Sequence, residues 1–156
     1  MIVPAFPEDL LVLDSDVLSD WRKSKSYTQR KIDEYVIRFG SLPALTSITV
    51  YEALYGFEKK AAASGSYSPL DRQGLQALHD LIDDCDVLPF DAEAASIAAQ
   101  ILPRINNNKM WKDVFIAATA LSHGRGVATR NRADYELIAK HVPAQYGSLH
   151  LAFWTY

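Results

Sequence analysis

The chain has few of the residues that form covalent cross-links or soft-metal sites. It contains a single cysteine, Cys85, so it can form neither an internal disulfide nor a cysteine-based zinc site. None of its four histidines has the spacing of a metal-ligand pair. A disulfide-stabilised scaffold is therefore excluded, and the cysteine content fits a reducing compartment.

Long apolar runs and an excess of positive charge are also missing. The longest uncharged stretch, 142–156, contains proline, glycine and histidine, whereas a membrane-spanning helix needs about 20 mostly apolar residues. The N-terminal apolar residues follow no basic segment and are interrupted by Glu8 and Asp9, so we expect no signal peptide. We therefore expect a cytoplasmic protein that does not bind a membrane. The net charge of −3 gives no overall attraction to nucleic acid but leaves room for a local basic face.

Short apolar runs alternate with helical patterns along the 156 residues. The runs typical of short strands are 10–13, 42–47, 86–90, 126–129 and 149–154. The segments with helical spacing begin near residues 17, 26, 48, 69, 92, 113 and 131. This alternation predicts an α/β fold with a mainly parallel sheet. The length favours a single domain over 1–156.

The segment 48–63 has apolar residues on two sides of its expected helix. Val50 and Leu54 belong to one stripe, and Tyr51 and Tyr55 to another. We expect both stripes to be covered by other parts of the fold, so that Glu52 between them is not freely solvated.

Polar side chains follow two of the expected strands at the point where each strand ends. Asp14 and Asp16 follow the first strand, and Thr129, Asn131 and Asp134 follow a later one. Because ligands of parallel α/β sheets bind outside the carboxyl ends of the strands, these side chains are candidates for a functional site.

Glu52 and Asp113 are two further candidate acids. Glu52 lies one turn into a helix that follows a strand, and Asp113 lies at a helix N-terminus. Two carboxylates about 4 Å apart repel by on the order of 4 kcal/mol at an effective dielectric of about 20. A divalent cation removes this cost, and oxygen ligands favour Mg²⁺ or Mn²⁺. Such an ion activates water and neutralises charge on a phosphodiester, so the pattern predicts metal-assisted phosphodiester hydrolysis.

Each candidate also has an ordinary structural interpretation. Asp14, Asp16 and Asp113 stand where carboxylates cap helices, Asn131 is a typical N-cap, and Asp134 alone is typical of a solvated helix surface. The functional interpretation depends on the acids following successive strands in one α/β pattern.

Four segments resemble, in order, the motifs of the PIN domain family, and in particular of the VapC-like ribonuclease toxins of bacterial toxin–antitoxin modules. They are LVLDSDVL at 11–18, TSITVYEALYG at 46–56, KDVFIAATA at 112–120 and TRNRADY at 129–135. The resemblance extends from about residue 10 to residue 154. One departure is Asp16, which stands where asparagine is common in the family.

The resemblance implies a three-layer α/β/α fold and a Mg²⁺-dependent endoribonuclease, with Mn²⁺ as a substitute ion. The residues it implies for holding one or two ions and for catalysis are Asp14, Glu52, Asp113 and Asp134. Those it implies for supporting them are Ser15, Asp16, Thr129 and Asn131. A water would attack the phosphorus of single-stranded RNA, and the partners implied are a cognate antitoxin in a groove near the site and a second copy of the chain.

Basic and aromatic residues supply candidates for RNA contacts. One group of candidates is a local basic stretch, which consists of Arg22, Lys23, Lys25, Arg30 and Lys31. Three further residues flank the acids and are candidates for phosphate contacts: Lys112, Arg130 and Arg132. Tyr27, Trp111 and Tyr135 are candidates for base stacking. The ordinary alternative is a solvated surface for the basic residues and packing for the aromatic ones.

Two other functions fit parts of the sequence. The segment 12–17 also resembles the opening motif of haloacid-dehalogenase-like phosphatases, with Asp14 as the phosphorylated nucleophile and Asp16 as the acid/base. That class needs a well-placed lysine and a late acidic pair after a strand, which this sequence does not offer. The second alternative is a non-catalytic PIN-like scaffold that binds RNA or a protein.

Overall fold

Parallel strands form the centre of the molecule. The computed structural model describes residues 3–4 and 9–155. A four-stranded sheet has the order β1-β6-β5-β2, and β3 pairs with β4, all in parallel. The strands are β1 (Val3–Pro4), β2 (Leu11–Leu13), β3 (Leu45–Thr46), β4 (Val87–Leu88), β5 (Gly126–Thr129) and β6 (His150–Phe153). Ala44 connects the two sheets, because it exchanges backbone hydrogen bonds with Leu11 and Leu13 of β2.

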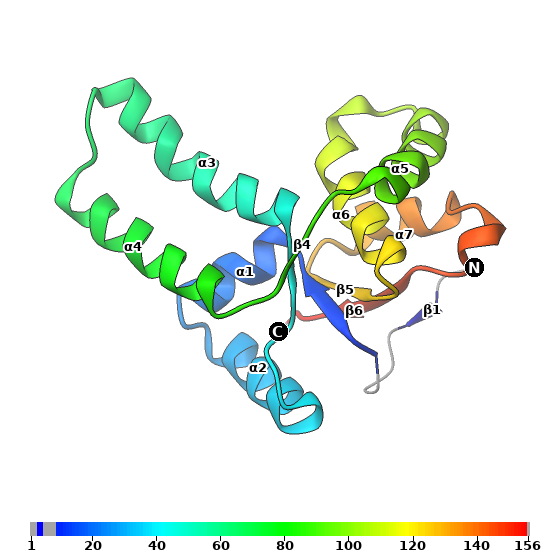
Figure 1. Ribbon diagram of the computed structural model, residues 1–156, viewed down its shortest axis with the longest axis horizontal. Helices are drawn as coiled ribbons and strands as arrows, with labels where there is room; N and C mark the ends of the chain where they lie inside the picture. Colours follow the sequence, from blue (N-terminus) through cyan, green and yellow to red (C-terminus); the bar gives the residue numbers. More distant parts are fainter. Residues whose placement is uncertain (1–2, 5–8, 156) are drawn as a thin grey trace.

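Helices cover both faces of this sheet, which confirms the predicted α/β fold. They are α1 (Ser15–Arg22), α2 (Ser26–Phe39), α3 (Ser47–Ser64), α4 (Pro69–Asp83), α5 (Ala92–Ile105), α6 (Trp111–Ser122) and α7 (Arg132–Lys140), with short 3-10 turns η1 (Asn108–Met110) and η2 (Ala144–Tyr146). Figure 1 shows α5, α6 and α7 together on one side, α1 and α2 on the other, and α3 and α4 extending away as a pair. No helix in the described part of the chain is long and apolar enough to cross a membrane.

Side chains on the strands alternate between two cores. Val12 and Val127 pack with the helices α5 to α7, whereas Leu13 and Ala128 pack with α1, α2 and α4. Successive residues of a strand point to opposite faces, so a sheet covered on both faces needs apolar residues at every position. This is why 11–13 reads as a continuous apolar run, and each large side chain buried there contributes about 1.5–3 kcal/mol.

Short capping signals set the ends of several helices. Asp14 and Asn131 are the N-caps of α1 and α7, as the sequence predicts, and Thr46 is the N-cap of α3, where the sequence predicted a strand. Gly40 ends α2 with a φ of 71°, a left-handed conformation that glycine adopts without strain. The predicted strand 42–47 is shorter than expected, because Thr46 already accepts a hydrogen bond from the Thr49 N–H of α3.

The expectation that α3 is covered on two sides is wrong. Tyr51 is 44% exposed and Tyr55 is 51% exposed, and their rings contact each other edge to face. The physical reason is the position of α3, which projects from the layers together with α4 (Figure 1). Its core-facing stripe, which includes Val50 and Leu54, is covered as expected.

Gly126 provides a test of how closely the strands pack. A Cβ atom at this position would lie 2.9 Å from the His150 carbonyl oxygen and 3.1 Å from Leu11 Cδ2. The carbonyl belongs to β6 and cannot move without disturbing the sheet. We predict that Gly126→Ala lowers the free energy of unfolding in urea by about 1–3 kcal/mol.

Gly56→Ala is the matched control, because a Cβ atom at this position in α3 meets nothing within 4 Å. It should stabilise the protein by up to about 1 kcal/mol through helix propensity. Equal unfolding midpoints for the two variants would contradict the packing argument.

Candidate active site

Asp14 is buried at the carboxyl end of β2 and is held in one orientation. The residue is only 4% exposed. Oδ1 accepts a hydrogen bond from the Ser15 N–H at 2.8 Å, and Oδ2 accepts one from Thr129 Oγ1 at 2.8 Å. The Asp14 N–H in turn donates to the Ala128 carbonyl at 2.9 Å. Asp14 is therefore fixed by both its own helix and the neighbouring strand β5.

Glu52 joins this group from α3. Ser15 Oγ donates a hydrogen bond to Glu52 Oε1 at 2.8 Å, and Lys112 Nζ lies 3.6 Å from Oε2. Three elements, α1, α3 and α6, thus meet at the Glu52 carboxylate. Glu52 is half-buried and not freely solvated, as the sequence predicts.

Asp113 and Asp134 approach from the first turns of α6 and α7. The charge of Asp113 interacts with the charges of Glu52 and Asp134, and less strongly with that of Asp16. Asp134 Oδ2 accepts a hydrogen bond from Asn131 Nδ2 at 2.8 Å. Asp113 is the acid whose charge interacts with those of both Glu52 and Asp134.

Burial and mutual repulsion alter the protonation of these acids. Desolvation, followed by the charges of Asp16 and Asp113, raises the pKa of Asp14 from 3.8 to about 7. Desolvation, followed by the charges of Glu52 and Asp134, raises the pKa of Asp113 from 3.8 to about 7. The pKa of Asp16 is also raised, chiefly by burial. These shifts mark a concentration of negative charge of the kind that is common at functional sites.

Three consecutive residues at the end of β5, Thr129 to Asn131, each bind a different acid. Thr129 donates to Asp14, the Arg130 N–H donates to the two carboxylate oxygens of Asp16 at 3.4 and 3.2 Å, and Asn131 donates to Asp134. The Asn131 N–H also donates to Thr129 Oγ1 at 3.0 Å, which links the two flanking side chains. We call residues 129–131 the acid-binding segment.

The donor set suits a hard cation. The candidate acids offer only carboxylate oxygens, which favour Mg²⁺ or Mn²⁺ over softer metals. Within residues 9–155, no three Asp, Glu, His or Cys side chains stand close enough to form a metal site by themselves. Mg²⁺ is usually held by one or two carboxylates and keeps several waters, so it needs no closed protein cage. The residues therefore fit Mg²⁺ bound through a few carboxylates and water.

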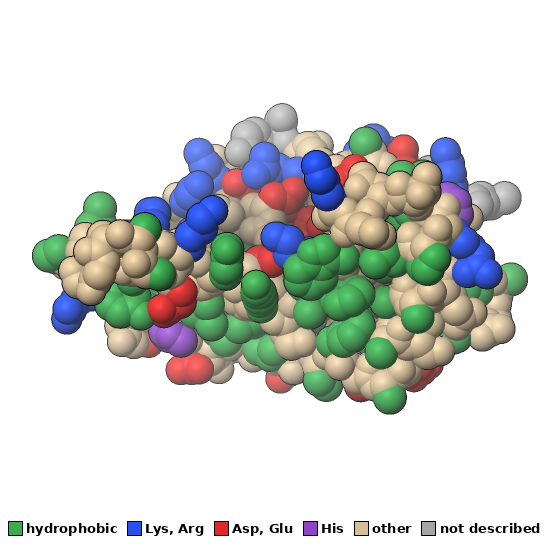
Figure 2. Space-filling view, turned by 90° about the horizontal axis from the view of Figure 1, so that it is seen from above, with side chains coloured by type: hydrophobic (Ala, Val, Ile, Leu, Met, Phe, Trp, Pro, Cys, Tyr) green, Lys and Arg blue, Asp and Glu red, His purple; other side chains and the backbone are tan. Residues whose placement is uncertain are grey.

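Figure 2 shows acidic and basic side chains gathered around a hollow in the surface, beside a group of apolar side chains.

The family model for the PIN domain matches residues 11–140, a span that contains all four sequence segments and all four candidate acids. The chain belongs to the PIN domain family. The match favours this interpretation over the phosphatase alternative, and the Lys112 ammonium contacts Glu52, not the proposed nucleophile Asp14.

Solved structures with the same fold include toxin–antitoxin proteins. VapBC2 from Rickettsia felis, bound to a promoter DNA fragment, has a TM-score of 0.70 and 18% identity over 93% of this chain and 98% of that chain. DNA-bound VapBC from Salmonella typhimurium has a TM-score of 0.68 and 22% identity over 99% and 100%. A toxin–antitoxin complex from Klebsiella pneumoniae has a TM-score of 0.61 and 17% identity over 80% and 89%. No curated protein sequence matches the chain.

The structure brings some of the candidate RNA-contacting residues of this PIN domain to the acids and not others. Lys112 lies beside Glu52, and the Arg130 side chain pairs with Asp20, Nε to Oδ2, at 2.8 Å. Arg132 pairs with Glu136 and covers the Phe153 ring. Lys23 is exposed at the end of α1.

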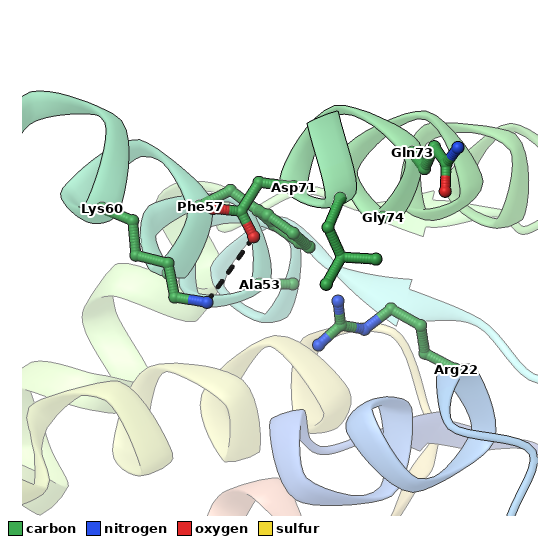
Figure 3. A pocket seen from close by; sticks show the side chains of 9 residues that line it. Arg22, Ala53, Phe57, Lys60, Asp71, Gln73 and Gly74 are labelled. Atoms are coloured by element: carbon green, nitrogen blue, oxygen red, sulfur yellow. Dashed lines mark ion pairs between the residues drawn. The ribbon is translucent and has the colours of Figure 1, made fainter. Parts of the chain in front are cut away.

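Arg22 faces a different part of the PIN domain. Its guanidinium lies 5.1 Å from the centre of the Phe57 ring and lines a cavity of about 560 Å³ between α1, α3 and α4. Figure 3 shows this cavity, with the Lys60–Asp71 ion pair on its far side from Arg22.

Tyr135 does not serve as a base-stacking platform. The residue is fully buried, and its hydroxyl makes no hydrogen bond of ordinary geometry. Burial, followed by the nearby charges of Asp14 and Asp113, raises the pKa of this hydroxyl well above its usual value of 10. Trp111 is half-buried and packs against Phe115 and Tyr51. Tyr27 contacts two cations, Arg30 and Lys31.

Asp20 is a buried acid that the sequence reasoning missed. It is 4% exposed and lies one helical turn after Asp16 on α1. The available signal was this spacing, because residues four apart share a helix face and two carboxylates there require a cation. Arg130 is that cation.

The acids make the stability of the metal-free protein depend on pH. A carboxyl with a raised folded pKa contributes stability that is fully present below its unfolded pKa and is lost as pH rises through its folded pKa. For Asp14 and Asp113 this window runs from 3.8 to about 7. We predict that Asp113→Asn, which cannot ionise, flattens the fall in Tm between about pH 4 and about pH 7, measured by circular dichroism in EDTA.

Asp33→Asn is the control, because Asp33 is exposed on α2. It should leave the pH dependence unchanged. A pH dependence in Asp113→Asn as steep as that of the wild type would refute the electrostatic account.

Proposed function

We propose that this PIN domain is a Mg²⁺-dependent endoribonuclease, with Mn²⁺ as a substitute ion. The observation that carries the proposal is the electrostatic coupling of four acids that follow β2 or lie on α3, α6 and α7. The charge of Asp113 interacts with those of Asp14, Glu52 and Asp134, and the pKa values of Asp14 and Asp113 are raised to about 7. These residues would hold one or two ions. A bound ion would lower the pKa of a coordinated water and neutralise charge at the phosphate.

The surrounding side chains orient the acids. Ser15 Oγ and Thr129 Oγ1 donate to Glu52 and Asp14, and both contacts measure 2.8 Å. Each donation leaves further carboxylate lone pairs free for an ion or a water. The Lys112 ammonium, 3.6 Å from Glu52, would bind a phosphate oxygen of the RNA.

We propose further that the chain acts as the toxin of a toxin–antitoxin pair. Support comes from the similar fold of the toxin–antitoxin complex from Klebsiella pneumoniae and of the two VapBC structures. The cavity beside Arg22 is a candidate binding site for the antitoxin, because Phe57 and Leu70, which is 77% exposed, form an apolar wall of the cavity. Burying such side chains on a partner is favourable by about 25 cal/mol per Å² of apolar area.

A homodimer is the second assembly we propose. The exposed pair Tyr51 and Tyr55 on α3, next to the half-buried Trp111, provides an aromatic surface for a second copy. Aromatic residues of this kind are enriched at protein interfaces.

Asp14→Asn tests catalysis separately from the scaffold alternative. In the wild type, millimolar Mn²⁺ should raise Tm, since an ion at 100 times its Kd stabilises the folded state by about 2.7 kcal/mol. We predict that Asp14→Asn reduces this shift and abolishes cleavage, measured by sequencing RNA ends after induction.

Asp33→Asn should leave both the Tm shift and cleavage intact, because Asp33 is exposed on α2. A wild type that shows no Tm shift with metal and leaves no new RNA ends would contradict the nuclease proposal and favour the scaffold function.

Leu70→Asp tests whether the antitoxin binds at the cavity beside Arg22. We predict that it weakens co-purification with the product of the neighbouring gene at least tenfold, because a carboxylate in the apolar wall is costly to bury. The Tm shift with Mn²⁺ should not change. Ile37→Asp on α2, at a position 86% exposed, is the matched control and should co-purify normally. Equal losses in both variants would contradict this location.

A further inference from the structure

Arg130 is attached to two successive turns of α1. Its backbone N–H donates to the Asp16 carboxylate at 3.2 and 3.4 Å, and its side-chain Nε lies 2.8 Å from Asp20 Oδ2. Asp16 and Asp20 are four residues apart, so they lie on the same face of the helix. Backbone and side chain of one residue thus join the acid-binding segment to α1.

Asp20 depends on Arg130 for its charge balance. Its side chain is 6% exposed, and the contact of its Oδ2 with the Arg130 Nε is an ion pair without the alignment of an ordinary hydrogen bond. A buried carboxylate is costly unless a cation or a hydrogen bond compensates it. The Arg130 guanidinium is therefore committed to Asp20, which leaves it less available for the phosphate contact that the sequence suggests.

The residues on either side of Arg130 are the ones that reach the candidate metal ligands. Thr129 Oγ1 donates to Asp14 and Asn131 Nδ2 donates to Asp134, each at 2.8 Å. Consecutive Cα atoms are about 3.8 Å apart, so a shift of Arg130 displaces both neighbours. The ion pair is the side-chain contact that holds the middle of this segment.

We propose that Asp20 and Arg130 form a positioning pair, which sets the metal affinity of the site by holding Thr129 and Asn131 against the acids. The proposal rests on the proposed function, since it assigns the pair a role in metal binding. Neither residue needs to touch the ion or the RNA. A contribution to folding stability does not by itself explain the pair, because proteins in which neutral residues replace a buried ion pair are often as stable as the original.

The test compares Asp20→Asn, Arg130→Gln and the double variant with the wild type. Each full-length protein is titrated with Mn²⁺ in a calorimeter without RNA, and its unfolding midpoint is measured in urea. Arg130→Gln keeps the backbone N–H that binds Asp16, so it removes only the guanidinium. The double variant has no buried unpaired charge, and it should fold even if Arg130→Gln does not.

Both single variants and the double variant should bind Mn²⁺ at least tenfold more weakly than the wild type, as expected when partners that orient metal ligands are removed. The double variant should regain urea resistance relative to Arg130→Gln without regaining affinity. Asp71→Asn is the matched control, because it also removes the acid of an ion pair, that with Lys60, away from the candidate ligands. It should bind Mn²⁺ within about twofold of the wild type.

Two results would overturn the proposal, and they differ. If the double variant binds Mn²⁺ within about twofold of the wild type, the pair serves stability only, and the proposed function still stands. If the wild type binds no Mn²⁺, the proposed function itself fails and the pair has no metal site to position.

Discussion

The mutual repulsion of buried carboxylates is the constraint on which the rest of this site depends. Parallel pairing of β2 with β5 aligns Leu13 with Ala128, so Asp14 and the acid-binding segment leave the sheet at the same edge. Asp113 then adds its charge from α6, and the pKa of Asp14 and of Asp113 is raised to about 7. Such an arrangement is tolerable only because hydroxyl, amide and backbone donors, together with Lys112, surround the acids.

Burial of apolar side chains in the two cores provides the free energy of folding that offsets the repulsion between the acids. Val12 and Leu13 are fully buried on opposite faces of the same strand, and Asp14 follows them directly. A strand covered on both sides fixes where Asp14 leaves the sheet, and hydrogen bonds from Ser15 and Thr129 orient its carboxylate. The site is thus assembled at the point where the packing of the sheet ends.

The sequence singled out these acids through its motifs, because Asp14 directly follows a strand and the other three lie in the first two turns of helices. It assigned the basic and aromatic residues less well. Arg130 was expected to contact phosphate, yet its guanidinium pairs with Asp20. Tyr135 was a candidate for base stacking, yet it is fully buried. Both outcomes depend on contacts with other elements of the fold: Asp20 lies more than a hundred residues before Arg130 in the chain, and Tyr135 packs in the core that α5, α6 and α7 form.

The sequence by itself determined the α/β alternation, the helix caps at Asp14 and Asn131, and the identity of the four candidate acids, because apolar periodicity and capping act over a few neighbouring residues. Only the tertiary structure decided which donor meets which carboxylate, that Asp20 is buried against Arg130, and that Tyr51 and Tyr55 face solvent. The reason is physical: solvation and charge compensation are set by groups that the fold brings together from distant parts of the chain, and no local pattern encodes them.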